Sequence, residues 1–186
     1  MKLPFALTCV VATACHPAPQ ATVPQPAAPP TSAASSASTP LSPELERLRF
    51  YLGEWSCKVD VYDGGDQVKS TEELAVLVHP VLAGTWLSIE VIENGKKVTS
   101  ELKGYDATNK RWRHLWVADN GQNGSLSSDG WHGDQMVFLD DPPLPGTKGG
   151  RMTFTKISDN DYSHRAETDN GNGFRIDFEK RCHKQT

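Results

Sequence analysis

The sequence predicts an all-β protein: an antiparallel up-and-down closed barrel of about ten strands, with a short N-terminal helix. Turn signals recur about every ten residues after Gly53, and the segments between them alternate apolar and polar residues. No second helix-rich segment follows, which argues against an α/β enzyme fold. A long meander removes its exposed edges best by closing on itself.

Nine breaks separate the ten predicted strands. They are Asp63-Gly64-Gly65-Asp66, Pro80 to Gly84, Asn94-Gly95, Asp106-Ala107-Thr108-Asn109, Asn120-Gly121, Gly133-Asp134, Asp140 to Gly150, Asp159-Asn160-Asp161 and Asn170-Gly171-Asn172-Gly173.

Length and charge limit the function classes. The chain has 186 residues, of which 37% are hydrophobic, and this fits one modest domain. Its 23 acidic residues outnumber its 19 basic ones, which argues against a nucleic-acid surface. The one apolar run, residues 3–14, is shorter than the roughly 20 residues that a membrane-spanning helix needs. We therefore expect no integral membrane protein.

Residues 1–14 have the layout of a signal peptide: Lys2, then an apolar stretch, then small residues. The stretch ends in Ala12-Thr13-Ala14-Cys15, which resembles a bacterial lipobox and makes Cys15 the expected lipid anchor. The alternative is ordinary cleavage near Ala14, which leaves Cys15 as a thiol. The resemblance implies an exported lipoprotein of a Gram-negative bacterium, periplasmic or anchored in the outer membrane. The residue after the cysteine is His16 and not Asp, which favours the outer membrane.

Residues 15–43 then form a predicted disordered linker. From His16 to Pro43, 23 of 28 residues are Pro, Ala, Ser or Thr, and none is Asp, Glu, Lys or Arg. Such a composition builds no core and suits a stalk that holds a folded domain away from a membrane. A spacer with no further role is the alternative. The folded domain is expected over residues 44–186.

The domain is predicted to open with an amphipathic helix of about three turns. Ser42-Pro43-Glu44 supplies a cap, a suitable first residue and a negative charge at the positive helix end. Leu45, Leu48 and Leu52 share one face, and Gly53 ends the helix. The apolar stripe is small, so the helix should pack on the barrel.

Alternation assigns the inward faces of the first and last strands. The expected inward residues are Trp55, Cys57, Val59 and Val61 in the first strand, and Phe174, Ile176 and Phe178 in the last. Cys57 and Cys182 fall on these inward faces, and the first and last strands are neighbours in a closed barrel. Because an exported protein meets an oxidising compartment, a disulfide between the two is predicted. Two buried free thiols are the alternative.

Several motifs together resemble a bacterial family of unknown function whose members are lipocalin-like, calycin-type barrels with an N-terminal Leu-x-Gly-x-Trp motif. The similarity covers about residues 44–182. The residues that carry it are Leu52-Gly53-Glu54-Trp55, Val81 to Leu87, Gly104-Tyr105-Asp106, Trp112 and Trp116. The resemblance implies a cavity for a small, largely apolar molecule, and it implies no reaction.

The candidate ligand-binding residues are aromatic residues and histidines on predicted strands. Trp112, His114 and Trp116 share one strand face and could form a wall with one polar group, but parity alone leaves open whether this face or that of Arg113, Leu115 and Val117 is inward. Trp86 and His164 complete the candidate set.

Haem is a minor alternative as cofactor. His164 could reach a haem iron, but the glycines that follow Gly-x-Trp in the haem-binding nitrobindins are missing, and the last strand has no inward histidine.

No motif for catalysis, phosphate binding or a metal site occurs, so catalysis is not expected. Three hypotheses remain. The barrel binds a small apolar ligand; or it is a hydrolase or isomerase that uses His114 or His164 with a carboxylate such as Glu90; or side chains fill it and it serves as a structural or interaction domain. The membrane is expected as a partner only through the lipid anchor, and the oligomeric state is not predicted.

Overall fold

The structure is a computed structural model that describes residues 40–64 and 66–186. The predicted signal peptide, the anchor Cys15 and nearly all of the linker lie outside the described residues. Within the described ranges, no helix is long and apolar enough to span a bilayer.

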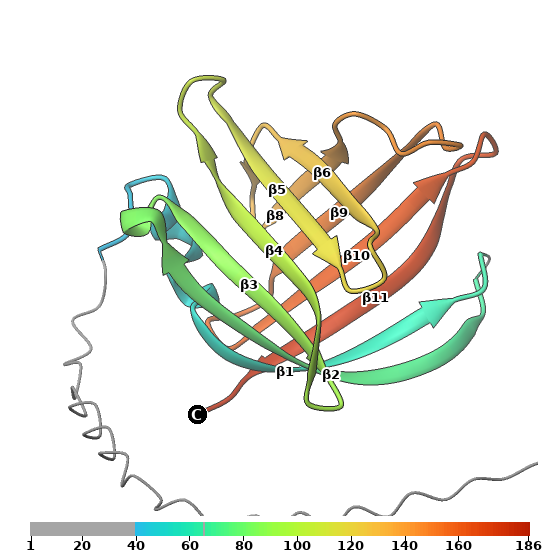
Figure 1. Ribbon diagram of the computed structural model, residues 1–186, viewed down its shortest axis with the longest axis horizontal. Coiled ribbons are helices and arrows are strands. Elements are labelled where there is room, and N and C mark those ends of the chain that lie inside the picture. The colour runs from blue at the N-terminus through green and yellow to red at the C-terminus, as the bar shows by residue number, and fades with distance from the viewer. Residues whose placement is uncertain (1–39, 65) are drawn as a thin grey trace, which may run out of the picture. The chain divides into compact units, whose positions relative to one another are not determined.

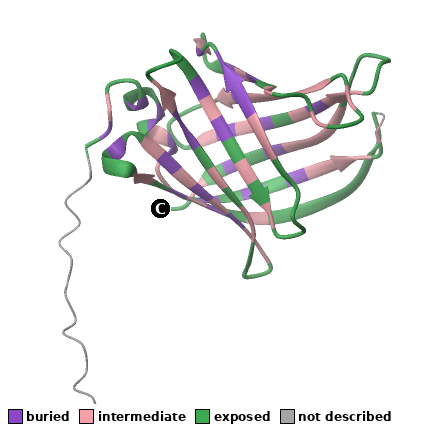
Figure 2. Cartoon of the chain, turned by 45° about the horizontal axis from the view of Figure 1, so that its top comes forward, coloured by how far each residue is buried: buried purple, intermediate pink, exposed green. Residues whose placement is uncertain are grey.

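The predicted closed antiparallel barrel is confirmed (Figure 1). Ten strands form its wall, and buried positions alternate with more exposed ones along them (Figure 2). The strands are β1 Gly53–Tyr62, β2 Val68–Val81, β3 Trp86–Glu93, β4 Lys96–Asp106, β5 Arg111–Ala118, β6 Asn123–Ser128, β8 Gln135–Asp140, β9 Gly149–Lys156, β10 Asp161–Asp169 and β11 Phe174–Lys184. The two-residue strand β7, Trp131–His132, arises from a break before Gly130 that was not predicted.

Every strand pairs with its neighbour in the chain, apart from β7, which pairs only with β8. The first and last strands also pair, in a register that places Cys57 opposite Cys182. The two cysteines form the predicted disulfide across this pair of strands, 125 residues apart in sequence.

The junction between β6 and β8 is short, because only two residue pairs join these strands. Two side-chain hydrogen bonds stabilise this junction: Arg113 donates to the Asp141 carboxylate at 2.7 Å and to Ser125 Oγ at 2.7 Å. The backbone N–H of Asp141 also donates to the Ser125 carbonyl. Backbone pairing and side-chain hydrogen bonds therefore close the barrel together at this point.

The predicted three-turn helix is wrong in type and length. The segment is the 3-10 helix η1, Leu45–Tyr51, and the Ser42 side chain does not cap it. A 3-10 helix has three residues per turn, so Leu45, Leu48 and Tyr51 lie on one face, and all three are fully buried. Leu52 already belongs to the extended connection to β1. A second, three-residue 3-10 turn, η2 Leu82–Gly84, joins β2 to β3.

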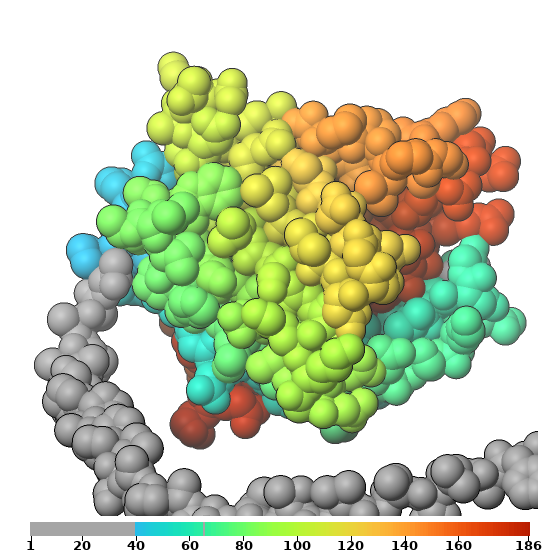
Figure 3. Space-filling view, in the orientation of Figure 1, coloured from blue at the N-terminus to red at the C-terminus, as the bar shows by residue number. Residues whose placement is uncertain are grey.

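An aromatic layer closes the barrel at the η1 end. The Tyr51 ring packs on Phe154 and Tyr162 with centroids 5.1 and 4.9 Å apart, and Trp55 donates its indole N–H to the Tyr51 carbonyl at 2.9 Å. The β1–β2 and β10–β11 hairpins lie at the other end of the barrel, in teal and red on the right of Figures 1 and 3. The interior space described below lies toward that hairpin end.

The predicted inward face of β11 is only partly correct. A bulge lets Ala166 pair with Phe178 and Glu167 with Ile176, which leaves Asp177 unpaired. A bulge reverses the alternation, so only Phe178 of the three predicted residues faces inward. Phe174 is 42% exposed.

Candidate functional site

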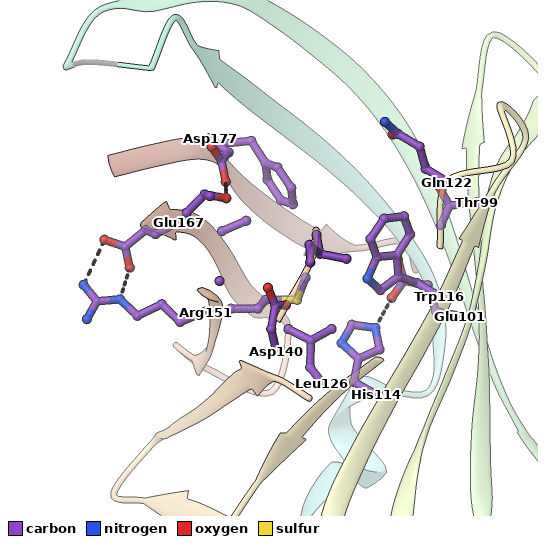
Figure 4. A pocket seen from close by; sticks show the side chains of 16 residues that line it. Thr99, Glu101, His114, Trp116, Gln122, Leu126, Asp140, Arg151, Glu167 and Asp177 are labelled. Atoms are coloured by element: carbon purple, nitrogen blue, oxygen red, sulfur yellow. Dashed lines mark hydrogen bonds and ion pairs between the residues drawn. The ribbon is translucent and has the colours of Figure 1, made fainter. Parts of the chain in front are cut away.

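The barrel contains a cavity of about 330 Å³ at the end opposite η1. Strands β4, β5, β6, β8, β9, β10 and β11 all contribute to its wall. It is lined by Thr99, Glu101, His114, Trp116, Gln122, Leu126, Asp140, Leu144, Gly150, Arg151, Met152, Ala166, Glu167, Thr168, Asp177 and Phe178. Figure 4 shows His114 and Trp116 on one side of this space and Asp177 on the other.

The apolar part of the wall depends on Trp116. Its ring lies over Gly124 of β6, where an added Cβ would come within 2.6 Å of the indole nitrogen. Any larger residue at position 124 would therefore force the ring to move. Gly124 thus leaves room for the ring of Trp116, which lines the cavity together with Leu126 and Phe178.

The polar part of the wall is a buried pair. His114 Nε2 lies 2.8 Å from the Glu101 carboxylate, and their side chains are 0% and 10% exposed. Burial would raise the pKa of Glu101, but the hydrogen bond and charge of His114, with the charges of Lys180 and Lys103, outweigh burial and lower it to about 2. Burial lowers the pKa of His114 despite its carboxylate partner. We therefore assign a neutral ring at pH 7 that donates from Nε2, which leaves a lone pair on buried Nδ1.

Lys103 lies deeper than this pair and is fully buried. Its Nζ has no hydrogen-bond partner among the described residues, and it lies 4.4, 5.1 and 5.4 Å from the ring centroids of Phe154, Tyr51 and Phe138. Burial lowers the pKa of Lys103 to about 7. The faces of the three rings thus provide the electrostatic attraction for the Lys103 ammonium that an acidic side chain would otherwise provide.

A second space of about 230 Å³ adjoins the first and shares Thr99, Glu101 and Phe178 with it. Lys180 of β11 lines this space and is 5% exposed. The interior of the barrel therefore combines apolar walls with several ionisable groups.

Two of the five predicted ligand residues line the larger cavity. The structure resolves the face of β5: Trp112, His114 and Trp116 are inward, while Leu115 and Val117 are 37% and 56% exposed. His114 and Trp116 reach the cavity, whereas Trp112 is packed in the core against Tyr105 and lines no described cavity.

The other two predicted residues lie elsewhere. Trp86 was predicted to contact the ligand, but its side chain lies on the outer face of the barrel. It pairs there with Gly104 of β4, and an added Cβ on this glycine would collide with the Trp86 ring. His164 is inward and fully buried, but the rings of Phe154 and Tyr162 lie 4.8 and 5.5 Å from it. It lines neither of the two spaces, and its Nε2 has no hydrogen-bond partner among the described residues.

The resemblance motifs have structural roles. Gly53 has a positive φ of 113°, and Trp55 is buried against η1. The Asp106 carboxylate accepts the backbone N–H groups of Thr108 and Asn109 in the β4–β5 turn.

The charged interior was not predicted from the sequence. Glu101 and Lys103 face inward while Leu102 between them is 36% exposed, which reverses the usual polarity of a strand. The proposed carboxylate Glu90 lies on the other parity of β3 from buried Ile89 and Val91, near Lys97. The inward position of Lys180 could have been predicted from the sequence, because Lys180 lies on the same face of its strand as Phe178 and Cys182.

The comparisons with known proteins establish the fold. No family model matches the chain, and no curated protein matches it. A solved structure that resembles it is the crystal structure of Rv2717c from M. tuberculosis, with 15% sequence identity and a TM-score of 0.55. The match covers 79% of this chain and 100% of Rv2717c. The similarity is one of fold, and it extends over the barrel.

Proposed function

We propose that the barrel binds a small molecule that has an apolar body and at least one hydrogen-bonding group. The observation that carries this proposal is the cavity of about 330 Å³, where Trp116, Leu126, Met152 and Phe178 supply apolar surface. His114 is the polar side chain that we expect the ligand to contact, since it lines the cavity and its buried Nδ1 has no partner among the described residues. A few polar groups in a largely apolar concave wall are typical of small-molecule sites. A barrel filled by its own side chains would leave no such space.

Binding can be tested with the neutral fluorescent probe N-phenyl-1-naphthylamine and two matched tryptophan variants. Trp116→Ala removes a cavity wall, whereas Trp86→Ala removes a ring of the same size from the outer face. We expect the probe to bind wild type and Trp86→Ala alike, and to bind Trp116→Ala more weakly by about 1 to 3 kcal/mol. Absence of probe binding to wild type, or equal loss in both variants, would refute the proposal.

We further propose that this binding domain works in the cell envelope, anchored through Cys15. The lipobox-like Ala12-Thr13-Ala14-Cys15 and the uncharged linker support this, and the disulfide fits an oxidising compartment. Cys15→Ser should move the protein from the membrane fraction to the soluble fraction, with the barrel still folded by circular dichroism. Recovery of wild type entirely in the soluble periplasmic fraction would contradict the anchor.

A further inference from the structure

Two nearly buried lysines, Lys103 and Lys180, lie inside the barrel. Glu101 is the carboxylate at the centre, and its charge acts on both Lys103 and Lys180. Two ammonium groups therefore share one carboxylate, which is already hydrogen bonded to His114. The other interior histidine, His164, is held neutral because burial lowers its pKa, as do the lysine charges. The two interior lysines thus outnumber the carboxylate that acts on both of them.

The two lysines differ in what surrounds them. Lys103 is enclosed by three aromatic rings at cation–π distance and lines neither space. Lys180 makes no hydrogen bond, ion pair or cation–π contact with any residue in the described part of the chain, and it lies on the wall of the second space. Its Nζ is beyond ion-pair distance from Glu101, and no other carboxylate acts on its pKa. Lys180 is thus a nearly buried lysine on the wall of a cavity, with no hydrogen-bond or ion-pair partner among the described residues.

Buried charges in proteins are normally paired, because an unpaired one loses its hydration without compensation. The two spaces adjoin, since Glu101, Thr99 and Phe178 line both of them. We propose that the ligand of this barrel is an apolar acid whose carboxylate or similar oxyanion binds Lys180. The inference rests on the proposed function and adds the charge of the ligand to it.

The acidic residues near the hairpin end do not occupy this position. Asp140 accepts the backbone N–H groups of Leu144 and Gly150, and Asp177 accepts the Thr168 hydroxyl at 2.7 Å. Glu72 lines the second space but is exposed, and Ser70 donates to it. The anion is therefore expected at the inner end of the site, with the apolar body toward the larger cavity.

Three ligands of equal chain length test the charge: decanoate, decanol and decylamine, each measured by displacement of N-phenyl-1-naphthylamine. We expect decanoate to bind about tenfold or more tightly than decanol, with decylamine weakest. Lys180→Met should abolish the preference for decanoate over decanol, while Lys180→Arg should keep this preference. Lys58→Met is the matched control, because it removes the same charge from an exposed position of β1.

The outcomes separate this inference from the proposed function. Equal binding of decanoate and decanol to wild type refutes the anion site but leaves a ligand-binding barrel. Tight binding of decylamine also refutes it and assigns the polar end to Glu101. Failure of all three ligands and of the neutral probe refutes the proposed function itself. The wild-type comparison needs no variant, so it decides the question even if Lys180→Met fails to fold.

Discussion

Replacement of Lys103 by Met should stabilise the protein, although it changes a fully buried residue. Burial lowers the pKa of Lys103 from its ordinary 10.5 to about 7. At about 1.4 kcal/mol per pKa unit, holding the proton in the folded state at pH 7 costs at most about 4 to 5 kcal/mol. Contacts with the rings of Tyr51, Phe138 and Phe154 offset about 2 kcal/mol of this cost. Met keeps the apolar stem, so the expected net gain is about 1 to 3 kcal/mol.

The gain should depend on pH in one direction. Because the folded pKa is depressed, the unfolded chain binds this proton up to higher pH than the folded protein does. The free energy of unfolding of wild type therefore rises as pH increases from about 7 to about 10.5, while the variant lacks this contribution. The advantage of Lys103→Met is largest at and below neutral pH and shrinks toward pH 10.5.

Urea denaturation followed by tryptophan fluorescence, at about pH 6.5 and about pH 10, measures both effects. Lys58→Met serves as control, because this exposed lysine should change stability by less than about 0.5 kcal/mol at either pH. A loss of stability in Lys103→Met, or a gain that is the same at both pH values, would refute the reasoning. The first result would mean that the ammonium has a partner that offsets its burial.

Three further predictions concern the disulfide, the buried ion pair and the core. Reduction of the disulfide between β1 and β11 should lower the free energy of unfolding by about 2 to 5 kcal/mol, and identical urea midpoints with and without reductant would contradict this. Glu101→Gln should cost about 3 to 5 kcal/mol at neutral pH by thermal or urea unfolding. The contribution of Glu101 in wild type is present above its ordinary pKa of 4.5 and is lost as pH falls toward about 2, so the difference between the two proteins should narrow over that range. Trp112→Ala should lower stability by about 3 to 5 kcal/mol but leave the affinity of the folded protein for the neutral probe unchanged, and weaker binding would place Trp112 in the site.

The architecture was predictable because it depends on local signals that every segment repeats. Turn residues at regular intervals and period-two alternation determine an antiparallel meander, and closure follows from its unpaired edges. The same parity argument placed Cys57 and Cys182 on facing strands, which the structure confirms. The η1 segment was predicted with the correct buried leucines at 45 and 48, but a spacing of three residues fits a 3-10 helix as well as one turn of an α-helix.

Only the tertiary structure decided which residues make the site. Alternation identifies two faces of a strand but assigns the inner one on the assumption that the interior is apolar. In β4 this assumption fails: Glu101 and Lys103 are inside because partners from β5, η1 and β9 surround them, and Leu102 is left outside. In β11 the bulge at Asp177 reverses the parity. Sequence alone determined the barrel, whereas pairing between distant strands determined which charges it encloses.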